Sequence, residues 1–141
     1  MLPRALAITI ALLCAACAGV AAHEPAADAG CRVGDALVET QLFFGLSKPK
    51  GGAVSARAFD AFVAREVAPR FPEGFTVLDG AGFWRDNTSQ RTIAEKSKVV
   101  VRLHGGDAAA DQAIGAIVEA YKTTFDQESV LRVDRPVCAQ F

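Results

Sequence analysis

Polar and apolar positions alternate with a period of two in three stretches of the chain, 36–44, 95–103 and 129–134. This alternation predicts half-buried β-strands, because successive side chains of a strand point to opposite faces of a sheet. A fourth, largely apolar run covers 75–84 and pairs naturally with 95–103 as a central hairpin. The segment 79–82 (Asp-Gly-Ala-Gly) interrupts that run, which predicts a bulge or a close approach by another backbone.

Two further segments carry apolar side chains at helical spacing. The first begins after Ser55, a good N-cap residue, and ends at Pro69; its apolar stripe consists of Phe59, Phe62, Val63 and Val67. The second begins after Asp107, another capping residue, and its stripe consists of Ile114, Ile117, Val118, Tyr121 and Phe125. These spacings predict two amphipathic helices, each with one face for the core.

The predicted order of elements is β-α-β-β-α-β. A chain with this order folds most naturally as an α+β, ferredoxin-like domain, with a four-stranded antiparallel sheet and two helices on one face. We expect the other, open face of the sheet to be largely polar. The residues assigned to it are Glu39, Gln41, Phe43, Lys98, Val100, Arg102, His104, Val130 and Arg132.

The first 22 residues have the pattern of a signal peptide. Arg4 supplies a short positive segment, 5–13 is apolar, and 20–22 fits the small-residue cleavage pattern. The apolar run is too short for a retained membrane-spanning helix. We therefore expect an exported protein, periplasmic or extracellular. Its predicted parts are a signal peptide over 1–22, a tether over 23–35, a single domain over 36–138 and a tail over 139–141.

A second cleavage site competes with the first. Leu13-Cys14-Ala15-Ala16-Cys17 is similar to a bacterial lipobox, in which small residues precede an acylated cysteine. Cys14 stands where the usual pattern has an aliphatic residue. Lipidation of Cys17 is one alternative, and the other is that both cysteines are ordinary small apolar residues of the signal peptide. Membrane contact is expected only through such a lipid anchor.

Two cysteines remain outside the signal segment, Cys31 and Cys138. In an oxidising compartment such a pair predicts a disulfide. The predicted topology places the last strand antiparallel beside the first, which brings the two cysteines to the same edge. Two free thiols or a metal pair are the alternatives, but with only His23 and His104 to help they form a poor zinc site. No metal and no cofactor is expected.

The near-neutral charge of the chain does not indicate a highly charged partner. The full chain has 15 Lys and Arg against 16 Asp and Glu, and residues 1–22 contain one arginine and no acid. The rest of the chain therefore has a formal charge of 14 − 16 = −2. A chain this close to neutral is not expected to bind nucleic acid.

Several runs of this sequence resemble a bacterial exported family, domain of unknown function 3574. These runs are 42–45 (Leu-Phe-Phe-Gly), 70–79 (RFPEGFTVLD), 82–85 (Gly-Phe-Trp-Arg), 95–98 (Glu-Lys-Ser-Lys) and 127–134 (QESVLRVD). The resemblance covers nearly all of 36–138 and implies a small exported domain without an assigned activity. Similar sequences tend to have a polar residue, often Gln, where Phe83 stands here. A ligand contact made by that residue would be missing from this chain.

Two groups of residues are candidates for binding. On the predicted open face, Glu39, Phe43, Arg102 and His104 combine aromatic, cationic and carboxylate groups, which suits an anionic small ligand or a partner sheet. The alternative is an ordinary solvated face with weak cross-strand ion pairs. On the hairpin, Trp84, Arg85 and Glu95, with Asp79 nearby, could hold a polar ligand through charge-assisted hydrogen bonds. The alternative is an ion pair between Glu95 and Arg85, with Trp84 closing the end of the core.

Three functions are consistent with these residues. The first is a non-enzymatic module that binds a protein partner or itself through the open face or an edge strand. The second is a small-ligand binding protein with Phe43, Arg102 and His104 as contacts. The third is a small dimeric enzyme that uses His104 for acid–base chemistry, because no serine or cysteine stands in a nucleophile motif. The interaction module is the preferred reading, and an enzyme is the less expected one.

Overall fold

The computed structural model describes residues 30–86 and 89–141. The expected signal peptide 1–22, the lipidation candidate Cys17 and most of the tether lie outside the described residues. The elements, in chain order, are β1 (Asp35–Gly45), α1 (Ala56–Phe62), η1 (Val63–Val67, a π-helical turn), β2 (Thr76–Arg85), β3 (Thr92–His104), α2 (Ala108–Phe125) and β4 (Leu131–Ala139).

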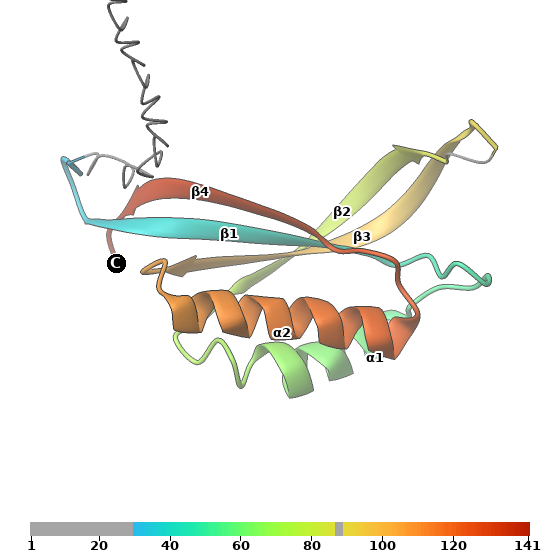
Figure 1. The fold of residues 1–141 in the computed structure, drawn as a ribbon, viewed down its shortest axis with the longest axis horizontal. Coiled ribbons are helices and arrows are strands. Elements are labelled where there is room, and N and C mark those ends of the chain that lie inside the picture. The colour runs from blue at the N-terminus through green and yellow to red at the C-terminus, as the bar shows by residue number, and fades with distance from the viewer. Residues whose placement is uncertain (1–29, 87–88) are drawn as a thin grey trace, which may run out of the picture.

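The four strands form one antiparallel sheet in the order β2-β3-β1-β4. Both helices lie on the same side of this sheet (Figure 1). The predicted α+β, ferredoxin-like arrangement is therefore confirmed, including the position of the last strand beside the first. None of the helices in the described part of the chain has the length and apolar content needed to cross a bilayer.

The core lies between the sheet and the helices and is built on aromatic rings. Phe44 of β1 contacts Phe59 and Phe62 of the first helix and Tyr121 of the second, with ring centroids 4.6–6.0 Å apart. All four side chains are fully buried. The stripe spacing in each helix brings these rings onto one face, where their edge-to-face contacts add to the hydrophobic stabilisation. The Tyr121 hydroxyl donates a hydrogen bond to the Gly45 carbonyl oxygen (2.7 Å).

The helix limits follow the predicted capping residues. The Ser55 hydroxyl accepts a hydrogen bond from the Ala58 N–H (3.2 Å), and the Asp107 carboxylate accepts one from the Ala110 N–H (2.7 Å). These caps satisfy backbone donors that the first helical turn leaves unpaired. The first helix continues as the π-helical turn η1, and Pro69 follows it closely. The helix starts are therefore where the sequence placed them.

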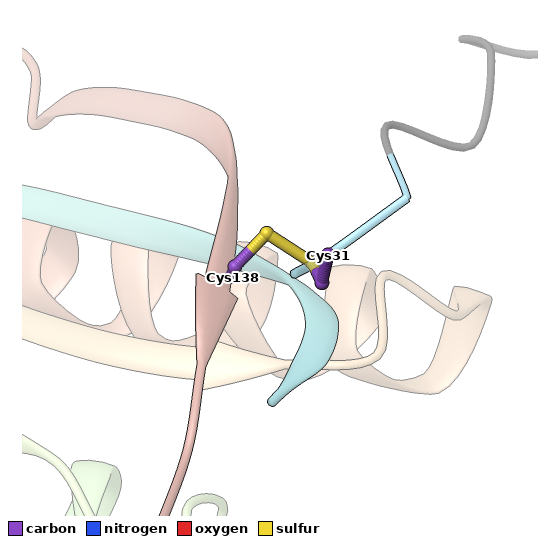
Figure 2. The surroundings of a disulfide bond; sticks show 2 residues. All are labelled: Cys31 and Cys138. Atoms are coloured by element: carbon purple, nitrogen blue, oxygen red, sulfur yellow. A yellow bond between two sulfur atoms is a disulfide. The ribbon is translucent and has the colours of Figure 1, made fainter. Parts of the chain in front are cut away.

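The predicted disulfide is present between Cys31 and Cys138, whose Cα atoms are 5.5 Å apart (Figure 2). Cys138 pairs with Ala36 in the ladder between β1 and β4, so Cys31 reaches it from just before β1. The bond closes a loop with a sequence separation of 107 residues. The two ends of the domain are therefore covalently joined at one edge of the sheet.

Two strand predictions need correction. The segment 79–82 contains no bulge, because β2 pairs with β3 in one unbroken register through this segment. Gly80 marks a close approach by a side chain and not by another backbone, since a Cβ at Gly80 would lie 2.7 Å from the Ser97 hydroxyl oxygen. The last strand continues to Ala139, well beyond the predicted end at 134, and includes Pro136. A proline is tolerated there because β4 is an edge strand.

The prediction of which β3 side chains lie on the open face is wrong. Glu39 pairs with Leu103 and Thr40 pairs with Arg102, so Arg102 shares the helix-covered side with Thr40. The residues of the prediction that lie on this covered side are Lys98, Val100, Arg102, His104 and Arg132, and Val130, just before β4, also packs against the core. The sequence did not decide between the two sides because Val99, Val100 and Val101 place apolar residues on both. A shift of one residue in register exchanges the faces of a strand completely.

Candidate functional site

The side of the sheet that faces away from the helices, called the open face below, is mostly apolar. One row of apolar side chains crosses all four strands. From one edge to the other it consists of Leu78 of β2, Val99 of β3, Phe43 of β1 and Leu131 of β4, each paired with the next. The next row contains Val101 and Val133, with the polar residue Gln41 between them and Thr76 at the β2 end. The exposed fractions of Leu78, Leu131 and Val133 are 50%, 59% and 39%. A contiguous apolar surface of this kind on a small domain is typical of an interaction site.

Three polar side chains of the open face, Glu39, Gln41 and Arg135, are paired with one another. Glu39 accepts a hydrogen bond from the Gln41 amide (2.5 Å) and forms an ion pair with Arg135 of the neighbouring strand (2.8 Å). The Gln41 hydrogen bond, followed by that of Arg135, lowers the pKa of the Glu39 carboxyl. The predicted candidates Glu39 and Phe43 do lie on this face. Glu39 carries its charge within an existing pair.

A cavity of about 640 Å³ lies at one end of the open face. Its walls come from the ends of β1 and β3, from the loop that precedes β2 and from the C-terminal residue; they include Leu37, Glu39, Glu73, Phe75, Val101, Leu103, His104 and Phe141. The volume falls in the range of small-molecule pockets. The polar side chains in the lining are those of Glu39, Glu73, Thr76 and His104, and the others are apolar. The cavity could take an apolar side chain of a partner or a small molecule with hydrogen-bond donors.

On the covered side of the sheet, His104 belongs to a chain of hydrogen bonds that runs across three strands. The Gly106 N–H contacts His104 Nδ1 (3.1 Å), and His104 Nε2 lies 2.8 Å from the Thr40 hydroxyl oxygen. That hydroxyl donates to Asp134 Oδ1 (2.5 Å). Arg132 forms an ion pair with Asp134 (2.9 Å) and another with Asp111 of α2 (2.6 Å).

This arrangement fixes the role of each group. Because His104 Nδ1 accepts the Gly106 N–H, the ring proton is on Nε2 and is donated to Thr40, whose own proton goes to Asp134. Burial lowers the pKa of His104, and the neighbouring Arg102 lowers it further. Burial alone would raise the pKa of Asp134, but the hydrogen bonds from Thr40 and Arg132 lower it on balance. Both ring nitrogens are engaged, so the geometry does not favour acid–base catalysis by His104.

Arg102 is buried on the same side of the sheet. Its guanidinium lies over the Phe71 ring, with Cζ 4.2 Å from the centroid, and Nη2 is 3.5 Å from Glu73. The atoms Nε and Nη1 are buried and have no hydrogen-bond partner among the described residues. The cation–π contact therefore provides much of its stabilisation. The structure does not place Arg102 and Phe43 on one surface, so they do not form the expected ligand site.

The hairpin group is also separated. The ladder between β1 and β3 ends at Gly45 and Ser97, and the Leu46 N–H makes one more hydrogen bond to the Lys96 carbonyl oxygen (3.0 Å). Beyond these contacts β2 and β3 continue as a projecting two-stranded arm, residues 80–86 and 89–96 (Figure 1). Glu95 accepts a hydrogen bond from the Ser47 N–H (3.2 Å) instead of pairing with Arg85. Trp84 is half exposed on the arm and does not close the core. Asp79 pairs with Lys98 (2.6 Å).

The apolar open face and the Thr40–Asp134 contact were not found from the sequence. The spacing of Arg132 and Asp134, two apart on one strand, was the available signal for the second. Within residues 30–86 and 89–141, no three His, Cys, Asp or Glu side chains are grouped as a metal site would require.

Comparison with known proteins gives a family and a fold. The sequence model described as "Protein of unknown function (DUF3574)" matches residues 39–141. No curated protein matches the sequence. A phage SAM lyase in complex with S-methyl-5′-thioadenosine is similar in structure, with a TM-score of 0.55 and 16% sequence identity, over 78% of this chain and 95% of that chain. The apo state of a phage SAM lyase matches with a TM-score of 0.52 and 17% identity, over 79% of this chain and 96% of that chain. At these identities the similarity shows the fold alone.

Proposed function

This chain belongs to the family described as protein of unknown function (DUF3574), and from that premise we propose that it is a protein-binding module that docks a partner on its open face. The observation that carries this proposal is the apolar row of Leu78, Val99, Phe43 and Leu131 across the uncovered side of the sheet. The disulfide is compatible with the exported, oxidising setting in which this module is expected to act.

The partner surface that fits is apolar. Outside the arm, the sheet contains 11 residues of β1, nine of β4, residues 97–104 of β3 and residues 76–79 of β2. At about 3.3 Å by 4.8 Å for each residue, these give roughly 500 Å² of sheet, before side chains add to it. A standard interface buries about 800 Å² of accessible surface on each partner, so the open face supplies most of the area that one needs. Glu39 and Arg135 neutralise each other, so this pair presents no net charge that an apolar partner would have to desolvate.

A photo-crosslinking amino acid tests this proposal in the cells that produce the protein. It is placed at Leu131 of the open face and, in a matched control, at Ala61, which is exposed on the helical side. The expected result is a covalent adduct with one defined protein from position 131 and none from position 61. With that protein purified, Val133→Glu is expected to weaken binding at least tenfold, because a charge would be buried in the apolar interface. Identical adducts at both positions, or none at 131, would refute the proposal.

The cavity at the end of the open face supports a second candidate, a small-ligand binding protein. The structural neighbour is described in complex with S-methyl-5′-thioadenosine, a nucleoside with ribose hydroxyls and an adenine amino group as hydrogen-bond donors and an apolar methylthio group. Glu39 and Glu73 could accept such hydrogen bonds beside the apolar wall of Leu37 and Leu103. Calorimetric titration of S-methyl-5′-thioadenosine into the protein and into Leu103→Glu tests this candidate. Binding that Leu103→Glu abolishes would support it, and an absence of heat in both would reject it.

A further inference from the structure

We infer that two copies of this chain pair their β2 strands antiparallel about a two-fold axis at Gly82, which joins two four-stranded sheets into one sheet of eight strands. This surface is an edge of the sheet and is distinct from the open face. The inference therefore goes beyond the proposed function and does not depend on it. It starts from the difference between the two edge strands.

The edge strand β4 carries features that hinder pairing with another strand, and β2 does not. Pro136 removes a backbone donor from β4, and Arg132, Asp134 and Arg135 add charges along it. The strand β2 is ten residues long, contains no proline, and has only Asp79 and Arg85 as charged residues. Exposed edges without such protection are templates for another strand. The β2 edge is therefore the one built to be paired.

The hairpin arm gives an independent reason. The arm has only two strands, because β1 ends its pairing at Gly45, and a two-stranded ribbon alone is marginally stable in water. Its aromatic residues Phe83 and Trp84 are 72% and 48% exposed. Pairing of two arms would create a four-stranded antiparallel sheet and would bury part of both side chains. A second copy of the chain supplies the two additional strands, so no other component is needed.

Strand geometry limits the register of such a dimer. In an antiparallel ladder, a residue whose N–H and C=O point outward must face another residue that points outward. Two copies of one strand can therefore pair only residues whose numbers have an even sum. Among the central registers, the one that places Gly82 opposite itself also places Asp79 opposite Arg85 twice. Registers centred one residue away on either side place Asp79 opposite Phe83 or Ala81 opposite Arg85.

The side chains in this register fit one another. Lys98 contacts Oδ1 of Asp79, whose side chain is 88% exposed, so the Arg85 of the second copy can approach the same carboxylate. Trp84 lies opposite Gly80, and an aromatic side chain covering a cross-strand glycine is a stabilising pair in sheets. Ala81 lies opposite Phe83. The two-fold axis is perpendicular to the sheet, so both open faces look in the same direction and form one double-width surface.

Cysteine cross-linking tests the axis. Opposite residues of antiparallel strands have Cα atoms about 4.5–5.5 Å apart, within the reach of a disulfide. A Cβ at Gly82 meets only ordinary contacts, 3.6 Å from Glu95 Cγ, so Gly82→Cys is compatible with the fold. Ala94→Cys, on the other strand of the arm, is the control, because three strand spacings, about 14 Å, would separate the two copies of residue 94. Mild oxidation is expected to give a covalent dimer from Gly82→Cys and not from Ala94→Cys or the unmodified chain. Equal yields from both variants, or no dimer from Gly82→Cys, would overturn the inference.

Charge reversal tests the register. Sedimentation velocity is expected to show a dimer whose dissociation constant rises roughly tenfold in Arg85→Glu, because like charges then face each other at two symmetric positions. Adding Asp79→Lys to Arg85→Glu restores opposite charges and is expected to recover most of the affinity. A dimer unaffected by Arg85→Glu, or a double variant no better than the single one, would exclude this register. Val133→Glu leaves β2 unchanged, so loss of partner binding in that variant without loss of the dimer separates the two proposals.

Discussion

Replacing Thr40 by valine isolates the contribution of the hydrogen-bond chain between His104 and Asp134. Valine has nearly the same shape as threonine, and the side chain is almost fully buried, so packing is largely kept. The hydroxyl that accepts from His104 and donates to Asp134 is lost. The buried imidazole N–H then has no acceptor, whereas the partly exposed Asp134 can turn to water.

The magnitude follows from those two contacts. An unsatisfied buried donor costs about 1–3 kcal/mol, and a hydrogen bond to a charged group contributes about 1.5–3 kcal/mol, part of which water replaces at Asp134. We expect the free energy of unfolding to fall by about 2.5 kcal/mol. Thr40→Ser keeps the hydroxyl and removes one buried methyl group, which costs about 1 kcal/mol.

Urea unfolding followed by far-UV circular dichroism measures both variants. With an m-value of about 1.5 kcal/mol/M, the midpoint of Thr40→Val is expected to fall by about 1.7 M, and that of Thr40→Ser by less than half as much. Thr40→Val measures the loss of the hydrogen bonds, and Thr40→Ser measures the loss of packing by the methyl group. The reasoning is refuted if valine costs no more than serine, since the hydroxyl would then contribute nothing beyond its volume.

Three further results are expected. The pKa of His104 is lowered in the folded state, so the folded protein binds fewer protons than the unfolded one. Stability from this group is complete above its unfolded-state pKa of about 6.5, declines as the pH falls below that value, and is lost once the pH has passed the lowered folded-state pKa. The urea midpoint measured from pH 8 to pH 5.5 should therefore decline, and His104→Gln should flatten the decline. Replacing Cys31 and Cys138 by serine should lower stability by about 5 kcal/mol in the chain-entropy estimate, with the thermal midpoint as the readout and an unchanged midpoint as the contrary result. Phe44→Ala should cost about 3–5 kcal/mol, because Phe44 contacts rings of both helices, whereas Phe83→Ala on the exposed arm should cost far less.

The sequence predicted the elements of the fold because each carries a local signal. Ser55 and Asp107 cap helices by their own chemistry, and the stripes of Phe59 and Tyr121 recur at helical spacing. The pairing of β1 with β4 was also accessible, because the chain order and the two cysteines point to the same edge. These inferences need no knowledge of distant contacts.

Which side chains lie on which face of the sheet depends on the pairing register between strands, and a single strand's sequence does not contain that register. Apolar residues at Val99, Val100 and Val101 leave both sides of β3 plausible, and only the register with β1 decides that Arg102 and His104 are covered. A buried histidine and a buried arginine look like surface residues in a sequence, because their partners Thr40 and Phe71 are distant along the chain. The sequence therefore predicted a binding site of charged residues, whereas the candidate site in the structure consists of the apolar rows of the open face.

The bond between Cys31 and Cys138 also determines how the domain responds to mechanical force. A pull applied to the chain on either side of the domain passes from residue 31 through the sulfur atoms to residue 138 and bypasses the loop of residues 32–137 between them. The sheet and both helices then carry no load, because every one of them lies inside that loop apart from the last two residues of β4. Stretching alone cannot extend the loop, and an added reductant would release its full length in a single step.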